Sequence, residues 1–311
     1  MKYCYGVDIG GTTVKMGLFE ENGNILDKWE IVTRVEDEGK EILPDIAVSI
    51  LEKTKEHGLE KTDIIGIGVG VPAPVTADGI VNGSANLGWT YKEVKRELEE
   101  LTGITSVIGN DANVAALGEM WKGGGAGQKN MVMITLGTGV GGGVIINGKV
   151  ITGEHGAGGE VGHLCVNYDE PDTCGCGNHG CLEQYASATG IVRLAKKRLE
   201  WDTRETALKK ESVTAKDVFD AVKAGDTVAI DVAEEFGKYL ASGLVNLAVI
   251  ADPAVIVIGG GVSKAGEILI PFIEKPYREK AFFANRKIEF KLATLGNDAG
   301  ICGSAKMMLD A

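Results

Sequence analysis

Apolar side chains along this 311-residue chain recur with two periods, and the two alternate from one end to the other. Short continuous or alternating apolar runs predict strands, whereas apolar residues three or four apart predict amphipathic helices. The alternation of strands and helices favours an α/β fold. The predicted strands are 3–9, 14–19, 25–33, 64–71, 105–108, 131–136, 144–146 and 255–258, and the predicted helices are 44–57, 91–101, 112–121, 230–249 and 298–309.

The second half of the chain repeats the opening theme of the first half. Residues 3–9 and 131–136 are apolar strands that each run into a glycine turn, a further strand and a hairpin turn. This duplication predicts two related lobes that face one another across a cleft. We expect the first lobe to span residues 1–117 with a returning helix at 299–311, and the second lobe to span 118–298.

Composition narrows the classes of partner. The formal net charge is −12 and the basic residues are scattered, so we expect neither nucleic acid nor an anionic membrane surface as a partner. No apolar run approaches the ~20 residues that span a bilayer, and no secretory signal is recognisable, which predicts a cytoplasmic protein. Cys4 and Cys302 fit small core residues. The glycine run at 123–127 is interpreted as a hinge or connector.

Glycine-rich turns follow three of the predicted strands. Glycine lets backbone N–H groups surround anionic oxygens, and a threonine hydroxyl adds a donor. None of the turns has the spacing of a P-loop or of a dinucleotide fold. A single glycine turn usually just completes a hairpin, but three together favour phosphate binding. Asp8 could hold Mg²⁺ through water or merely cap its turn. The candidate nucleotide-binding residues are Asp8, Gly10, Gly11, Thr12, Gly137, Thr138, Gly139, Gly259, Gly260 and Gly261.

Asn110 and Asp111 stand between a predicted strand and a predicted helix. A carboxylate there can be a helix N-cap, worth ~1 kcal/mol. It can also be a general base, with Asn110 binding a neighbouring hydroxyl, because phosphoryl transfer needs a carboxylate near the attacking oxygen. The two interpretations are compatible, and strand ends in α/β sheets are where ligands collect.

Three cysteines and one histidine gather within residues 163–181. His163, Cys174, Cys176 and Cys181 can complete a tetrahedral Cys3His zinc site of the closed, structural type. Such a site would also fix two nearby carboxylates, Glu160 and Glu183, which lie three residues before His163 and two after Cys181. The alternatives are a disulfide pair, or a zinc knot that only staples a loop.

These motifs resemble the ROK family, which contains repressors and sugar kinases. The likeness spans almost the whole chain and is most specific in the cysteine segment. Supporting matches are residues 8–12, 86–89, 110–113 and the companion sugar-binding motif at 158–163. The signature that matches at every fixed position is Cys174-x-Cys176-Gly177-x-x-Gly180-Cys181-x-Glu183-x-x-x-Ser187.

The resemblance implies a two-lobed, actin-like (ribonuclease H-like) kinase that uses ATP and Mg²⁺, with a structural Zn²⁺. By the same resemblance the substrate is a hexose, most closely D-glucose phosphorylated at its 6-hydroxyl as in bacterial glucokinases, and the protein is a homodimer. Asp111 is implied as the catalytic base. The implied sugar-binding residues are Asn86, Asn110, Asp111, Glu160, His163 and Glu183.

Four alternatives stand beside this interpretation. Fructose, mannose, N-acetylmannosamine or N-acetylglucosamine could replace glucose, because specificity at the 2-position depends on the depth of the pocket. Polyphosphate could replace ATP as the donor. A sugar-responsive repressor is disfavoured, because Asp8 stands only eight residues from the start, which leaves no helix-turn-helix segment before it. The intact Asp111 and glycine turns also speak against an inactive sugar sensor.

Overall fold

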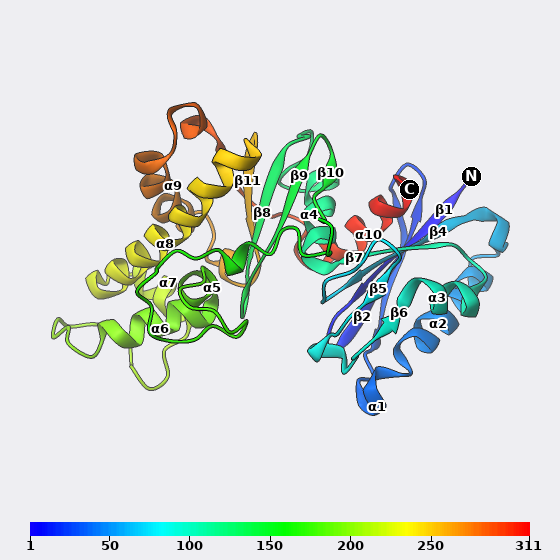
Figure 1. The fold of residues 1–311 in the computed structure, drawn as a ribbon, viewed down its shortest axis with the longest axis horizontal. Helices are drawn as coiled ribbons and strands as arrows, with labels where there is room; N and C mark the ends of the chain where they lie inside the picture. The colour runs from blue at the N-terminus through cyan, green and yellow to red at the C-terminus, as the bar shows by residue number, and fades with distance from the viewer. The chain divides into compact units, whose positions relative to one another are not determined.

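The computed structural model describes the whole chain and divides it into two compact units, each built on one five-stranded sheet (Figure 1). The chain passes between the units four times. Unit 1 comprises residues 1–127, 150–158 and 295–311, and unit 2 comprises residues 128–149 and 159–294.

Unit 1 has a mixed sheet. Its strands are β1 (Tyr3–Ile9), β2 (Thr13–Glu20), β3 (Ile25–Val32), β4 (Ile64–Val71) and β7 (Ser106–Asn110). They lie in the order β3-β2-β1-β4-β7, in which β1, β4 and β7 are parallel and β2 is antiparallel to both its neighbours. The carboxyl ends of three parallel strands therefore meet at one edge of the sheet. A small ribbon of β5 (Ile80–Val81) and β6 (Lys92–Glu93) completes the strands of this unit.

The sheet of unit 2 has the same plan. Its strands are β8 (Met131–Leu136), β9 (Val140–Ile146), β10 (Lys149–Val150), β11 (Val255–Gly259) and β12 (Glu289–Leu292). The boundary between the units falls within β10, after Lys149. The order is β10-β9-β8-β11-β12, with β8 antiparallel to β9, and with β8, β11 and β12 parallel. The predicted internal duplication is confirmed, because the two sheets have the same strand order, and each has an antiparallel pair (β1–β2, β8–β9) beside a set of three parallel strands.

Helices cover both faces of the first sheet. They are α1 (Glu36–Gly39), α2 (Ile42–Glu56), α3 (Val94–Thr102), α4 (Asp111–Lys122) and α10 (Ala299–Leu309). Side chains alternate along β1, so Tyr5 and Val7 pack in a core with α2 and α3. Cys4 lies on the opposite face, in a core with Cys302 and other residues of α10. Both cysteines are buried core residues, as predicted.

Two glycines let α10 lie directly on this sheet. A Cβ on Gly6 would lie 2.1 Å from the carbonyl oxygen of Ile301, and one on Gly68 would lie 1.8 Å from that of Ser304. The Ser304 hydroxyl donates to the carbonyl oxygen of Val7 at 2.7 Å. Backbone therefore packs on backbone, and the last helix of the chain becomes part of the core of unit 1.

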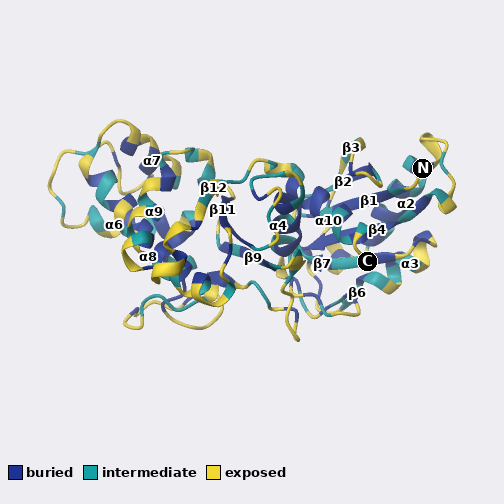
Figure 2. Cartoon of the chain, turned by 90° about the horizontal axis from the view of Figure 1, so that it is seen from above, coloured by how far each residue is buried: buried dark blue, intermediate teal, exposed yellow.

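Unit 2 is organised around one long helix. Its helices are α5 (Glu183–Ala186), α6 (Ala188–Arg198), α7 (Ala215–Lys223), α8 (Thr227–Ala251) and α9 (Leu269–Lys280). Asp226 caps the start of α8, because its carboxylate accepts from the N–H groups of Val228 and Ala229. Asp252, in the left-handed conformation, ends it. The buried face of α8 joins α6, α7 and α9 in one core (Figure 2).

The structure differs from the sequence prediction at several boundaries. The second predicted helix starts only at Val94, because residues 92–93 pair in the ribbon with β5. The expected division between residues 117 and 118 falls inside α4, which as one continuous helix lies wholly in unit 1. Residues 150–158 also lie in unit 1, although we expected them in the second lobe. No helix combines the length and the apolar character needed to cross a membrane.

Candidate active site

Thr33 holds the first glycine turn, which joins β1 to β2. The N–H of Gly10 donates to the carbonyl oxygen of Thr13 at 3.0 Å and closes the turn. The Thr33 hydroxyl donates to the carbonyl oxygen of Gly10 at 2.7 Å, and its N–H donates to that of Thr12 at 2.9 Å. In a trans peptide the N–H points opposite to the preceding carbonyl. The N–H groups of Gly11 and Thr13 are therefore directed away from Thr33.

Asp8 lies near the end of β1, on the face that α10 covers. A Cβ on Gly300 of α10 would lie 2.4 Å from Asp8 Oδ2, so glycine at this position leaves the room that the carboxylate occupies. Burial raises the pKa of Asp8, and Lys15, its partner across the β1–β2 ladder, opposes that rise. A carboxylate destabilised in this way gains from a nearby cation.

The chain turns from β7 into α4 at Asn110, which is the N-cap of the helix. Its Oδ1 accepts from the N–H of Asn113 at 3.1 Å, and its Nδ2 donates to the carbonyl oxygen of Ala73 at 3.2 Å. The cap that we considered for Asp111 is thus made by its neighbour, because Asn110 has the extended backbone of an N-cap. Asp111 is the first helical residue, where the helix dipole favours a carboxylate. Its Oδ1 accepts from the N–H of Ala112 at 2.8 Å.

Asn86 lies in a short 3-10 turn, Ala85–Leu87, next to the first glycine turn. A Cβ on Gly11 would lie 3.6 Å from the carbonyl oxygen of Asn86. Trp89 anchors this segment, because it is buried and its indole N–H donates to the carbonyl oxygen of Gly39 at 3.2 Å. Unit 1 thus brings Asn86 beside the turn after β1, at the sheet edge where β7 ends at Asn110.

The start of α6 orients the second glycine turn. The carbonyl oxygen of Gly137 accepts from the N–H of Ala188 at 2.8 Å, and that of Thr138 accepts from the Thr189 hydroxyl at 2.9 Å. The turn closes through the N–H of Gly137 and the carbonyl oxygen of Gly139. With two carbonyl groups directed toward α6, the N–H groups of Thr138 and Gly139 point the other way.

The third glycine turn lies beside the second. β8 and β11 are parallel neighbours, and a Cβ on Gly260 would lie 2.5 Å from the backbone of Leu136. Gly260 has a φ of +83°, which suits glycine and little else. The turn leads into a 3-10 segment, Val262–Ala265. Both turns of unit 2 thus stand at the carboxyl edge of one parallel strand pair.

A cavity of about 430 Å³ opens beside the third turn. Gly261 and Val262 form one wall, and residues of α7 form another. The sequence analysis did not predict this wall of the cavity. The spacing in the sequence could have indicated it, because one face of α7 carries three residues at helical spacing, Lys216, Phe219 and Lys223.

The four predicted metal ligands come together in unit 2. One ligand atom each from His163, Cys174, Cys176 and Cys181 lies within 4.8 Å of every other. Cys176 Sγ and Cys181 Sγ are 3.6 Å apart, and Cys174 Sγ is 3.9 Å from His163 Nδ1. A tetrahedral Zn²⁺ with bonds near 2.3 Å separates its ligands by about 3.8 Å. The cysteines form no disulfide, so the donor set fits zinc and the disulfide alternative is wrong.

Glu183 links this cluster to the second glycine turn. Its Oε1 lies 3.1 Å from Cys174 Sγ and 3.9 Å from His163 Nδ1. A Cβ on Gly139 would lie 2.7 Å from Glu183 Oε2, which explains glycine at that position. Glu160 immediately precedes the 3-10 turn Val161–His163, and its carbonyl oxygen accepts from the N–H of His163 at 3.2 Å. The same turn therefore places Glu160 and His163.

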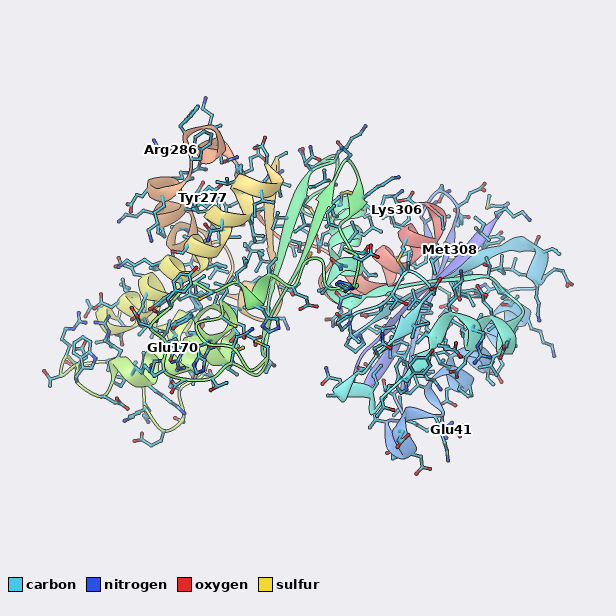
Figure 3. All side chains as sticks on the ribbon, in the orientation of Figure 1. Glu41, Glu170, Tyr277, Arg286, Lys306 and Met308 are labelled. Atoms are coloured by element: carbon cyan, nitrogen blue, oxygen red, sulfur yellow. The ribbon has the colours of Figure 1, made fainter.

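A buried ion pair holds the loop that carries the cysteines, and its acidic member, Glu170, is labelled in Figure 3. Glu170 accepts from Arg193, from the hydroxyl of Tyr185 and from the N–H of Asp172. Burial alone would raise the pKa of Glu170, but these hydrogen bonds outweigh burial and hold it at about 2. The Tyr185 ring also stacks on Tyr239 of α8, with centroids 3.8 Å apart. Sequence patterns gave no sign of this anchor.

The ROK family profile matches residues 4–311. The chain belongs to the ROK family. It is 45% identical over 308 residues to a protein named Glucokinase from Halalkalibacterium halodurans, covering 97% of this chain and 93% of that one. It is 38% identical to the Glucokinase of Thermotoga maritima over 312 residues, covering 97% and 96%.

A solved ROK structure resembles the whole chain. It is a ROK family glucokinase from Streptomyces griseus in complex with glucose and AMPPNP, with a TM-score of 0.78 and 33% identity, covering 99% of this chain and 100% of that one. The predicted family is therefore confirmed, and so is the predicted α/β, actin-like fold class.

Proposed function

We propose that this ROK protein is an ATP-dependent glucokinase, which transfers the terminal phosphoryl group of ATP to the 6-hydroxyl of D-glucose. One structural observation carries the proposal: β1 and β7 are parallel, and they end at the same sheet edge in the first glycine turn and in Asn110-Asp111. A phosphate cradle and a carboxylate at one edge are what phosphoryl transfer to an alcohol requires. The full-length similarity to proteins named Glucokinase supports the same activity.

In this proposal Asp111 is the catalytic base. Its carboxylate stands at the first position of α4, where the helix dipole stabilises the charged form. It accepts the proton of the sugar 6-hydroxyl as that oxygen attacks the terminal phosphorus of ATP. General base catalysis of this kind contributes about 10²–10⁴-fold to the rate.

The nucleotide is assigned to the three glycine turns. The outward N–H groups of Gly11, Thr138 and Gly139 bind phosphate oxygens. Asp8 would hold Mg²⁺ through water, and a bound cation would offset the cost of its buried carboxylate. The cavity beside Val262 and Phe219 is large enough for an adenine ring and lies at the third turn.

The sugar is assigned to Asn86, Asn110, Glu160, His163 and Glu183. Asn110 uses one N–H of its amide on Ala73 and keeps the other for a hydroxyl. His163 directs Nδ1 toward the cysteines, which leaves Nε2 for the sugar. Bound zinc would fix this loop as a closed, structural site.

The cellular and quaternary context is part of the proposal. We place the enzyme in the cytoplasm, where Mg·ATP is available, and expect a homodimer. The candidate interface residues are exposed apolar side chains of unit 2 that lie near the end of α8 and near Asn285. These two segments are joined, because Asn285 Nδ2 donates to Asp252 Oδ1 at 2.7 Å. These side chains are Val249, Ile250, Phe282 and Phe283. Light scattering of wild type and Phe283→Ser tests this interface.

A coupled ADP-release assay tests the activity. Wild type is offered glucose, fructose, mannose, N-acetylmannosamine and N-acetylglucosamine with Mg·ATP. Glucose is also offered with polyphosphate, and in that reaction the formation of glucose 6-phosphate is measured, because polyphosphate releases no ADP. We expect the highest kcat/KM for glucose with ATP. The Asp111→Asn variant should lose about 10²–10⁴-fold in kcat and still bind glucose, because only the base is removed. Normal turnover of that variant would refute the role of Asp111, and a higher kcat/KM for another sugar would replace glucose as the substrate.

A further inference from the structure

Helix α4 holds the ends of three of the four connections between the units. The chain crosses at 127/128, 149/150, 158/159 and 294/295. Two buried side chains of α4, Asn113 and Glu119, make hydrogen bonds to backbone within four residues of the first, third and fourth crossings. All of these contacts lie within unit 1. Neither residue belongs to the site described above.

Asn113 anchors the segment that leads into the sugar loop. Its Nδ2 donates to the carbonyl oxygen of Gly158 at 3.1 Å, and Gly158 is the last residue before a crossing and stands two residues before Glu160. The amide orientation is fixed, because its oxygen would repel that carbonyl. Asn113 Oδ1 is then buried with no hydrogen-bond partner, the one side-chain atom in residues 1–311 of which this holds.

The unpaired oxygen indicates why position 113 carries an asparagine and not an apolar residue. A leucine has the same number of side-chain heavy atoms, branched at the same carbon, and would bury no unsatisfied acceptor. The helix does not need this side chain as a cap, because Asn110 already fills that role. What the asparagine amide supplies, and leucine lacks, is the N–H that holds Gly158.

Glu119 anchors two other connections. It is fully buried, and a buried carboxylate is tolerated only when it is hydrogen-bonded. Its Oε2 accepts from the N–H of Gly124 at 2.7 Å, and its Oε1 accepts from the N–H of Leu295 at 2.8 Å. A Cβ on Gly123 would lie 1.9 Å from Glu119 Oε2, so the carboxylate fills the space beside the glycine run.

The body of α4 is fixed on α10. A Cβ on Gly118 would lie 2.2 Å from the carbonyl oxygen of Ala299, and one on Gly303 would lie 1.7 Å from that of Val114. The two helices touch backbone to backbone through these glycines. Anchors on α4 are therefore tied to the rigid core of unit 1, and to the helix whose first residue is Asp111.

We propose that Asn113 and Glu119 are positioning residues for phosphoryl transfer. They fix where three connections leave unit 1 relative to Asp111, and Asn113 in this way holds the backbone at Gly158, two residues before Glu160, without touching either substrate. The inference rests on the proposed kinase function for its kinetic consequence, whereas the anchoring itself is independent of the reaction.

The experiment compares Asn113→Leu and Glu119→Gln with wild type, in kinetics at a temperature well below every Tm and in hydrogen–deuterium exchange. A small misplacement of reacting groups costs up to about 100-fold, so we expect a 10- to 100-fold loss in kcat/KM for glucose. The KM for Mg·ATP should stay within about twofold, because the proposed phosphate turns are untouched. Exchange should rise in peptides covering 150–160 for Asn113→Leu, and in those covering 123–128 and 294–297 for Glu119→Gln.

Two controls separate positioning from stability. Thr102→Val removes a buried hydroxyl of α3 that bonds to Leu98 within unit 1 and holds no connection, so it should lose stability but keep kcat/KM. Glu119→Asp keeps both acceptor oxygens and should recover part of the activity that Glu119→Gln loses. If Asn113→Leu does not fold, Asn113→Ser, which also cannot hold Gly158, takes its place.

The proposal is overturned if the loss in kcat/KM follows the loss in Tm in the same proportion for all variants, Thr102→Val included. It is also overturned if hydrogen–deuterium exchange at the connections does not change. If wild type phosphorylates no sugar, the proposed function fails. The exchange measurement then decides the anchoring alone, with raised exchange supporting it and unchanged exchange refuting it.

Discussion

Removing the carboxylate of Glu170 tests what holds the cysteine-bearing loop. Its side chain is 2% exposed, and it accepts hydrogen bonds from Arg193, Tyr185 and the N–H of Asp172. In Figure 3 the label of Glu170 lies near α5 and α6, the helices that carry Tyr185 and Arg193. The substitution Glu170→Gln keeps the size of the side chain, removes its charge and replaces one of its two acceptor oxygens by an NH2 group, so it tests the anchor as a whole.

The magnitude follows from the pKa of the carboxyl. Burial would raise the pKa of Glu170, but the hydrogen bonds from Arg193 and Tyr185 bring it to about 2 from an ordinary 4.5. A pKa lowered from 4.5 to about 2 corresponds to roughly 3 kcal/mol of folding free energy. Breaking a buried ion pair by removing one partner costs about 3–5 kcal/mol, which agrees. We expect Glu170→Gln to lower Tm by about 6–12 °C.

The assay is calorimetric unfolding of wild type and Glu170→Gln across a series of pH values. Because the folded-state pKa is below that of the unfolded chain, the carboxylate of Glu170 stabilises the fold above about pH 4.5. This contribution is lost as the pH falls toward 2. The difference in Tm between the two proteins should therefore be constant near neutral pH and shrink below about pH 4.5.

The matched control is Asp172→Asn, because Asp172 also pairs with Arg193 but its side chain is 61% exposed. An exposed pair contributes less than about 1 kcal/mol, so this variant should unfold close to wild type. A double-mutant cycle of Glu170→Gln with Arg193→Met should give a coupling energy above about 1 kcal/mol. Equal Tm values for Glu170→Gln and wild type at neutral pH would refute the anchor.

Two further predictions follow from the metal site and from the sheet. Cys176→Ser should lose bound zinc, measured by elemental analysis, and should raise the KM for glucose about 10- to 100-fold in kinetics. Cys165→Ser is the control and should keep zinc. A zinc-free variant with unchanged KM would contradict the role of the metal. Gly68→Ala should cost about 3 kcal/mol in chemical denaturation, because α10 must move, whereas Gly70→Ala in the same strand, with no atom nearer than 3.5 Å, should not. Similar stabilities for these two variants would rule out close packing of α10 as the reason for Gly68.

Much of the site could be predicted from local spacing. Cys174, Cys176 and Cys181 lie close in sequence, so a short glycine-rich loop can bring them to one point whatever surrounds it. The glycine turns follow apolar strands, so the ends of those strands were visible as well. Such features depend on neighbours along the chain, and local backbone geometry decides them.

Other features depend on partners far along the chain. Position 68 requires glycine because the backbone of Ser304 lies against it. The buried carboxylate of Glu119 is stabilised by the N–H of Leu295. Glu170 looked like one more charged loop residue until the structure placed Arg193 beside it. No spacing rule connects such pairs, because their contacts form only when the helices dock on their sheets.

The sequence by itself determined the alternation of strands and helices, the duplicated sheet plan, the metal ligands and the membership of the family. These follow from side-chain periodicity and from motifs in which the interacting residues are near neighbours. Only the tertiary structure decided which residue caps α4, which helix lies on the glycines of β1 and β4, and which side chains hold the connections between the units. Packing at close range made those choices, because buried polar groups and buried backbone must find partners wherever the fold places them.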